Sequence, residues 1–350
     1  MKRHGGWLAC GAVAVGVWGG GASAQPAEAY EVVAPAPAES MPPVSFTAFF
    51  ENDGTFVRPN ENTDRHYTSG QGISVAFHQT GGQKVFDALG WDYDGTALGF
   101  VLGQQIYTPE VITEAIPDPD DRPFTGYLFF GTFFQREHHD VLDHFEIDLG
   151  ITGASSLAET AQETVHDITG DPDPDWSSQL DSEFAINVTY RRKWRQDLGR
   201  TEVWGLPLDW QLIPRFEVDV GTVLRRVSVG ADVRAGVNLP DDFGAARFID
   251  PRSATGEPLQ GLSHYAFVRV IGRYVEWNTF IEGSNYRNPS AAVSLEPFFG
   301  EAAAGAAVEW RRHNFVFNAT YLQSVFSREF EEQTTIDGLG SFSLSFIYEF

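Results

Sequence analysis

The sequence predicts an all-β protein, a transmembrane antiparallel β-barrel of about twelve strands with a short helix in one extracellular loop. Three observations lead to this prediction. The chain of 350 residues begins with a secretory signal pattern, and aromatic residues make up 14% of it. Its apolar residues alternate with polar ones and never form the run of roughly 18 that a membrane-spanning helix needs. Export, alternation and abundant aromatic side chains are together typical of strands with one face against lipid.

The N-terminal segment predicts export. Residues 1–24 have a positively charged start, a short apolar core and small residues before a cleavage site after Ala24. The apolar core is too short to span a bilayer. Cys10 is the only cysteine and lies in this segment, so we expect a mature chain without disulfides. Residues 25–42, rich in Ala, Pro and Glu, predict a disordered periplasmic lead-in, and residues 43–350 predict the barrel.

The first strand begins at Val44. Phe46 and Phe50 fall on one face of it, and Thr47 and Glu51 fall on the other. This alternation predicts a strand between lipid and a polar interior.

The last strand covers residues 341–350, with five apolar residues on one face, and it ends at Phe350. A terminal Phe is typical of barrels delivered to the outer membrane. The alternative is the edge strand of a soluble sandwich, which the signal and the aromatic content disfavour.

Ten further strands are expected between these two. Their predicted ranges are 67–79, 96–107, 125–138, 142–153, 182–195, 207–220, 224–237, 264–283, 293–311 and 314–327. The total of twelve is even, as in single-chain bacterial barrels. With both termini in the periplasm, loops 54–66, 108–124 and 154–181 lie on the outer rim. Residues 239–262 then form a periplasmic connection that is unusually long for this class.

One outer loop carries a helix signal. Ser156 and Glu159 have the spacing of a capping box, and Gly170 is a typical helix end. An apolar stripe would lie against the barrel wall or in lipid; it contains Leu157, Ala161, Val165 and Ile168. The opposite, polar face contains Glu159, Gln162 and His166.

Two rim segments offer side chains for chemistry. His166 is the candidate general base, because an imidazole exchanges protons near neutral pH; the alternative is a surface histidine near a helix end. Asn52 and Asp53 offer oxygens for a hard cation, or form an ordinary turn. Thr68 offers a hydroxyl, or is a simple strand threonine. Strand parity places all four on one rim, where base, cation ligands and hydroxyl suit ester hydrolysis by water.

Other classes of function are disfavoured. The net charge of −24 argues against nucleic acid as a partner. There is no G-x-S-x-G nucleophile elbow, so a serine mechanism of the hydrolase fold is not supported.

Seven short motifs follow one another through the first half of the mature chain. They are Glu51-Asn52-Asp53, Thr63-Asp64-Arg65-x-Tyr67-Thr68-x-Gly70, Gln104-x-Ile106-Tyr107-x-Pro109, Asp121-Arg122-Pro123-Phe124, Gly150-x-x-Gly153, Gln162-x-x-x-His166-x-x-x-Gly170 and Trp176-x-x-Gln179. As a set, in this order, the chain resembles the outer-membrane lipid A 3′-O-deacylase family (LpxR-like). The second half resembles that family only in strand pattern and length.

The resemblance implies a twelve-stranded barrel with its site between the outer wall and a loop helix. By this resemblance His166 activates water, Asn52 and Asp53 hold Ca²⁺ at the ester carbonyl, and Thr68 supports the site. Gln162 is assigned to substrate binding. The implied reaction removes the 3′-linked acyl chain from lipid A in the outer leaflet of a Gram-negative outer membrane. We expect a monomer whose partners are lipopolysaccharide and the membrane.

Two details of the family pattern stay open. An acidic residue after the helix matches either Asp171 or Asp173. A lysine that one relative uses after the third strand has no counterpart among residues 110–114. Arg122 and Arg65 are the nearest substitutes, and either could bind a lipid A phosphate or serve as a structural arginine. Two other functions remain possible: a catalytically silent or channel-type barrel, and an outer-membrane phospholipase.

Overall fold

The computed structural model describes residues 44–53, 64–78, 83–116, 118–248, 261–286, 293–313 and 315–348. The predicted signal peptide, the lead-in and the terminal Phe350 lie outside the described residues.

The described part of the chain forms one antiparallel sheet of thirteen strands, and twelve of them close into a barrel. The sheet is joined by pairing of the first strand with the last and of the sixth with the eighth. The barrel strands are β1 (Val44–Asn52), β2 (His66–His78), β3 (Gly95–Thr108), β4 (Thr125–His138), β5 (Val141–Thr152), β6 (Phe184–Trp194), β8 (Leu206–Gly221), β9 (Leu224–Val237), β10 (Gly261–Asn278), β11 (Phe298–Arg312), β12 (Phe315–Phe326) and β13 (Asp337–Tyr348). The predicted barrel of twelve strands is therefore confirmed.

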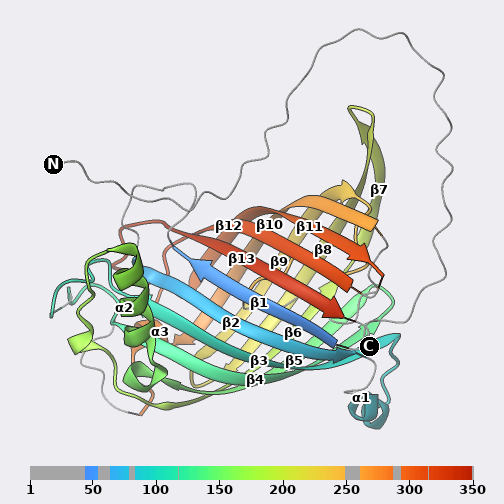
Figure 1. The fold of residues 1–350 in the computed structure, drawn as a ribbon. Helices are drawn as coiled ribbons and strands as arrows, with labels where there is room; N and C mark the ends of the chain where they lie inside the picture. Colours follow the sequence, from blue (N-terminus) through green and yellow to red (C-terminus); the bar gives the residue numbers. More distant parts are fainter. Residues whose placement is uncertain are drawn as a thin grey trace, which may run out of the picture. The chain divides into compact units, whose positions relative to one another are not determined.

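The thirteenth strand, β7 (Gln196–Val203), was not predicted. It pairs only with β8, as a hairpin that extends beyond the barrel wall (Figure 1). Nearly all of its residues are exposed, so the segment has no buried face and no alternation of apolar and polar residues that a sequence pattern could reveal.

The predicted end of β10 at residue 283 is wrong. Asn278 ends the strand, because its side chain accepts a hydrogen bond of 3.0 Å from the backbone N–H of Phe280 and so caps the short helix α3 (Thr279–Glu282). A helix of seven residues, α1 (Gln83–Leu89), also precedes β3 and was not predicted.

The two faces of the wall follow the predicted alternation. Phe46 and Phe50 of β1 are 39% and 49% exposed on the outside, whereas Thr47 and Glu51 are buried on the inside. Exposed aromatic and aliphatic side chains on the outer face are what a lipid environment requires of such a wall.

The described part of the long connection after β9, residues 238–248, folds into the barrel. Arg247 is buried and forms ion pairs with Glu51 of β1 at 3.0 Å and Glu301 of β11 at 2.6 Å. The ring of Phe248 lies against the inner wall, where a Cβ added to Gly72 or Gly103 would come within 2.5 or 2.6 Å of it. These glycines therefore make room for the ring. The part of this connection that the structure describes therefore enters the lumen.

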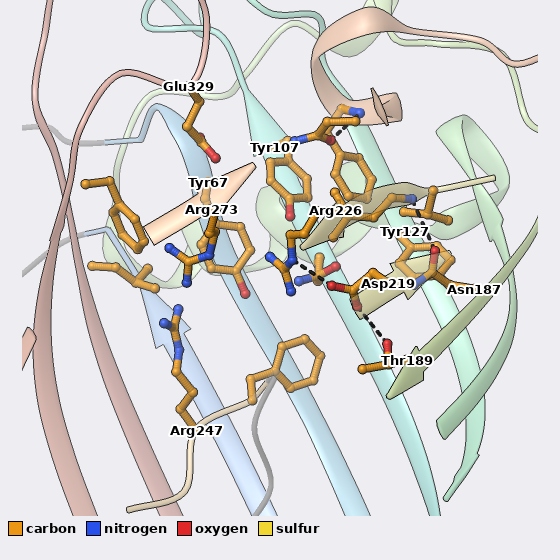
Figure 2. A pocket seen from close by; sticks show the side chains of 18 of the residues that line it. Tyr67, Tyr107, Tyr127, Asn187, Thr189, Asp219, Arg226, Arg247, Arg273 and Glu329 are labelled. Atoms are coloured by element: carbon orange, nitrogen blue, oxygen red, sulfur yellow. Dashed lines mark hydrogen bonds and ion pairs between the residues drawn. The ribbon is translucent and has the colours of Figure 1, made fainter. Parts of the chain in front are cut away.

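A cavity of about 160 Å³ lies in the lumen next to this segment. Figure 2 shows Arg226, Arg247 and Arg273 pointing into it, with Tyr67 and Tyr107 on its wall. The arginines are neutralised by neighbouring carboxylates, among them Asp219, which lies 2.7 Å from Arg226. The cavity is thus a polar, charge-balanced space.

The two ends of the barrel carry different structures. Helices α2 (Ala158–Thr169) and α3 lie at one end, and α1 and β7 lie at the end where β1 begins and β13 finishes (Figure 1). Strand parity makes the first end extracellular and the second periplasmic. None of the described helices is long and apolar enough to cross a bilayer.

Candidate active site

Helix α2 begins differently from the prediction. Ser156 belongs to a 3-10 turn, Gly153–Ser156, and its carbonyl accepts a hydrogen bond from the Gln104 side chain at 2.7 Å. Leu157 is the N-cap, at φ 61°, and no side chain caps the helix. The predicted capping box is wrong because Ser156 is held against the wall by Gln104. The predicted end is confirmed: Gly170 has φ 79°, and its N–H bonds the His166 carbonyl at 2.7 Å.

The helix packs on the outer face of the wall. Gln105 and Tyr107 of β3 line the lumen, so Gln104 and Ile106 point outward by alternation. Gln104 binds the turn before α2, and Ile106 packs in one apolar cluster with Ala158 of the helix. The helix therefore covers the extracellular ends of β3 and β4 from outside.

The orientation of α2 reverses the predicted packing. Gln162 and His166 are buried toward the wall, whereas Val165 and Ile168 are exposed, Ile168 by 80%. Of the two predicted locations of the apolar stripe, burial against the wall is wrong, and contact with lipid stays a prediction. The reason is that the structure offers polar partners to the other face: Asp64 for His166 and the indole N–H of Trp176 for Gln162.

His166 is held at both ring nitrogens. Nδ1 lies 2.6 Å from the carbonyl oxygen of Pro172, and Nε2 lies 2.7 Å from Oδ2 of Asp64. A carbonyl only accepts, so Nδ1 carries a hydrogen. A second hydrogen lies between Nε2 and the Asp64 carboxyl, and Nε2 is the ring nitrogen that can accept a proton when this hydrogen stays on Asp64. The side chain is only 4% exposed. The folded chain thus fixes the orientation that a general base needs.

Asp64 is a site residue that the sequence analysis missed. It immediately precedes β2, and the only signal for it was its place in the motif with Arg65 and Thr68. Burial raises the pKa of the Asp64 carboxyl; His166 and Gln162 oppose this shift, and the charge of Asp171 adds to it. The raised pKa reflects a carboxyl in a dry setting.

The rim residues connect to this pair through Asp53. Its Oδ2 accepts a hydrogen bond of 2.8 Å from the backbone N–H of Arg65, the residue after Asp64. Its own N–H bonds the Thr68 carbonyl at 3.0 Å, and the Asn52 amide reaches the same carbonyl at 3.4 Å. Continuous contacts therefore link the four predicted catalytic residues around Asp64.

Thr68 lies at a β-bulge. The register of β2 against β3 shifts between Tyr67 and Ser69, and His66 has φ 59°. The Thr68 hydroxyl is buried and hydrogen-bonds the Thr108 hydroxyl at 2.7 Å. Bulges of this kind redirect a side chain locally, and this one fixes the hydroxyl at the rim.

The predicted substrate-binding residues differ in accessibility. Gln162 accepts a hydrogen bond of 3.0 Å from Trp176 and is buried. Arg65 is partly exposed and lies 3.5 Å from both Glu110 and Asp337. The Arg65 side chain is thus 20% exposed and lies between two carboxylates. The role of each in binding stays a prediction.

Arg122 is fully buried. Its guanidinium lies 3.4 Å from Glu329, 5.2 Å from the Tyr107 ring centroid and 5.8 Å from that of Phe330. This setting favours the structural alternative for Arg122 over contact with a phosphate.

Of the two acidic candidates after the helix, Asp171 lies nearer the site. Its carboxylate accepts a hydrogen bond of 2.6 Å from Thr169, and its charge affects Asp64. Asp173 is exposed. The geometry favours Asp171 as the match to the family's acidic residue.

The rim offers oxygen donors suited to a hard cation. The amide of Asn52, the carboxylate of Asp53 and the carbonyl of Thr68 gather at the ends of β1 and β2. Carboxylate, amide and backbone oxygens are the ligand types that Ca²⁺ takes. The donor set therefore fits the cation that the resemblance implies.

Comparisons with known proteins identify the family. The family described as "Outer membrane protein LpxR" matches residues 23–348. The chain belongs to this family. LpxR from Salmonella typhimurium has a similar solved structure, with 18% identity and a TM-score of 0.68, covering 87% of this chain and 100% of that one. Membership in this family and the barrel fold place the protein in the Gram-negative outer membrane.

An autotransporter barrel has a less similar solved structure. The β domain of the Bordetella autotransporter BrkA matches with 11% identity and a TM-score of 0.42, covering 89% of this chain and 100% of that one. No curated protein sequence matches the chain.

Proposed function

We propose that this LpxR-family protein is a lipid A 3′-O-deacylase that hydrolyses the 3′-linked acyl ester in the outer leaflet with the help of Ca²⁺. The observation that carries the proposal is the fixed His166 ring beside the Asn52–Asp53–Thr68 rim. A buried base next to hard oxygen donors is the combination that ester hydrolysis by water uses.

In the proposed reaction, water replaces Asp64 at Nε2 of His166 when substrate binds. His166 accepts a proton from this water as its oxygen attacks the acyl carbonyl. The bond between the acyl carbon and the sugar oxygen then breaks, and His166 returns the proton to that oxygen. Bound Ca²⁺ would polarise the ester carbonyl. Pro172 keeps the ring in place throughout, and the products are a fatty acid and lipid A with a free 3′-hydroxyl.

The channel alternative is opposed by the lumen. Arg247 and Phe248 fold into it and are held by buried ion pairs and by the glycines of the wall. The phospholipase alternative shares the chemistry, and it differs only in the head group that is bound.

The deciding experiment is mass spectrometry of lipid A from cells producing the protein or its His166→Ala variant. We expect loss of one 3′-acyl chain with the protein, and a rate at least about 100-fold lower for the variant. His313→Ala, in a periplasmic turn, is the matched control and should keep full activity. Unchanged lipid A together with hydrolysis of glycerophospholipid would favour the phospholipase.

The cation requirement is tested by chelation. We expect a calcium chelator to abolish activity and added Ca²⁺ to restore it, since the ester carbonyl loses its polarising charge. Asp53→Asn should raise the Ca²⁺ concentration needed for half-maximal activity, because one anionic ligand is removed. Full activity of the protein in excess chelator would contradict the role of Ca²⁺.

A further inference from the structure

Two adjacent histidines face one aspartate at the periplasmic end of the barrel. His138 ends β4, His139 begins the turn to β5, and Asp94 immediately precedes β3. The cluster is at the opposite end of β3 and β4 from α2, and it has no part in the proposed deacylation.

The distances in this cluster suit a shared ion better than a hydrogen bond. Nδ1 of His138 and Nδ1 of His139 each lie 3.5 Å from Oδ2 of Asp94. The three ligand atoms all lie within 4.8 Å of one another. Protein hydrogen bonds between nitrogen and oxygen are shorter, about 2.7–3.2 Å. Ligands held about 2.1 Å from a tetrahedral metal are about 3.4 Å apart.

The backbone preorganises the three side chains. His139 has φ 53°, a left-handed conformation that brings its ring centroid within 4.1 Å of that of His138. The N–H of Asp94 bonds the Glu137 carbonyl at 2.8 Å, and the N–H of His139 bonds Oδ2 of Asp94 at 2.5 Å. Asp94 is therefore fixed to the same turn that presents both imidazoles.

The imidazole of His138, the less exposed of the two at 31%, has its Nδ1 atom near this carboxylate but beyond hydrogen-bond distance. Within the described ranges, Nδ1 of His138 is a buried atom with no hydrogen-bond partner. Buried polar atoms normally have a partner. A metal ion between this nitrogen, His139 and Asp94 would supply one.

We propose that Asp94, His138 and His139 form a binding site for a divalent first-row transition metal such as Zn²⁺. Two imidazoles and one carboxylate are a ligand set that suits Zn²⁺ and its neighbours, whereas Ca²⁺ and Mg²⁺ prefer oxygen alone. His139 is 77% exposed, which leaves room for water at the fourth position. The site would tie the start of β3 to the β4–β5 turn.

The test is a titration of the mature barrel in detergent with Co²⁺, a coloured substitute for Zn²⁺, using protein without a polyhistidine tag. We expect one equivalent of Co²⁺ to give the visible absorption of a tetrahedral site, and Zn²⁺ to displace it. Excess Ca²⁺ should leave the spectrum unchanged, because a hard cation does not compete for imidazole. The His138→Ala/His139→Ala variant should bind at least about tenfold more weakly, and Asp94→Asn should weaken binding too.

His313→Ala is the matched control, since His313 is also an exposed periplasmic histidine, at the same φ of 53°. Heat-modifiable migration on gels verifies that each variant is folded. The proposal is overturned if the folded double variant binds Co²⁺ as tightly as the wild type, or if the wild type gives no Co²⁺ spectrum. It is also overturned if His313→Ala weakens Co²⁺ binding as much as the double variant does. None of these results depends on lipid A hydrolysis, so this site and the proposed function are tested separately.

Discussion

His166, the general base of the proposed reaction, is held in one orientation by its neighbours. The Pro172 carbonyl fixes one nitrogen, and Asp64 occupies the other. Because Asp64 occupies the proton-accepting nitrogen, the carboxylate both orients the ring and must give way to water. Asp64 is therefore a positioning residue in the proposed mechanism.

Burial raises the pKa of Asp64 despite the opposing effect of His166. As pH falls, the folded protein therefore protonates Asp64 before a free aspartate would be protonated, and the negative charge that faces His166 is lost. We expect activity to decline across this interval. Asp64→Asn should be less active at neutral pH and should lack this step in its pH profile.

The same shift affects stability. The folded state binds this proton more tightly than the unfolded state, so the Asp64 contribution to the free energy of unfolding decreases as pH rises between the ordinary and the raised pKa. The free energy of unfolding, measured at several pH values, should fall less steeply with pH in Asp64→Asn than in the wild type. Asp173→Asn, at an exposed position, should show the same pH dependence as the wild type. An identical slope in both variants would contradict this assignment.

The position of helix α2 is determined more by the backbone conformation at its ends than by burial of its apolar stripe. Its N-cap has no side-chain hydrogen bond, and it stops at Gly170 in the left-handed conformation. Its buried face contains Gln162 and His166, whereas Val165 and Ile168 are exposed. Displacement of the C-terminal turn would move the Pro172 carbonyl away from His166.

We expect Gly170→Ala to destabilise this turn by about 1–2 kcal/mol, because an alanine resists positive φ. No atom beyond the adjoining residues lies within 4 Å of the added Cβ, so crowding by other parts of the protein does not contribute. Hydrogen exchange of α2 should accelerate, and deacylation should slow. Gly90→Ala is the control: Gly90 has φ 67° and equally open surroundings but lies after α1. If both variants keep full activity, α2 does not need this end to hold His166.

The barrel as a whole is closed by its own chain. The segment that contains Arg247 crosses from the periplasmic end into the lumen and pairs with carboxylates of β1 and β11. Charges in the lumen are thereby neutralised, and the side chain of Arg247 occupies part of the pore, which agrees with the proposed deacylase better than with a channel.

Arg247→Ala should lower the free energy of unfolding by about 3 kcal/mol, because it leaves Glu51 and Glu301 buried without their shared cation. Urea unfolding of the barrel in detergent measures this. Arg200→Ala is the control; Arg200 pairs with Asp209 on the exposed β7–β8 hairpin, and its loss should cost less than about 1 kcal/mol. Equal effects of the two variants would show that the lumen pair does not stabilise the barrel.

Much of the fold was predictable because strand alternation is a local property. Each strand displays its lipid face and its polar face in consecutive residues, so the number and order of the barrel strands could be read along the chain. The helix end at Gly170 was equally local. The exposed strand β7 and the failed cap at Ser156 were not predictable, because neither depends on a pattern within its own residues.

The sequence by itself determined the class of protein, the barrel strands, and which loops share the extracellular rim. It also pointed to His166 and the Asn52–Asp53 pair. Only the tertiary structure decided that Asp64 holds His166, that α2 turns its polar face to the wall, and that Arg247 enters the lumen. These contacts join residues far apart in the chain, and they form only once strand register and barrel closure bring those residues together.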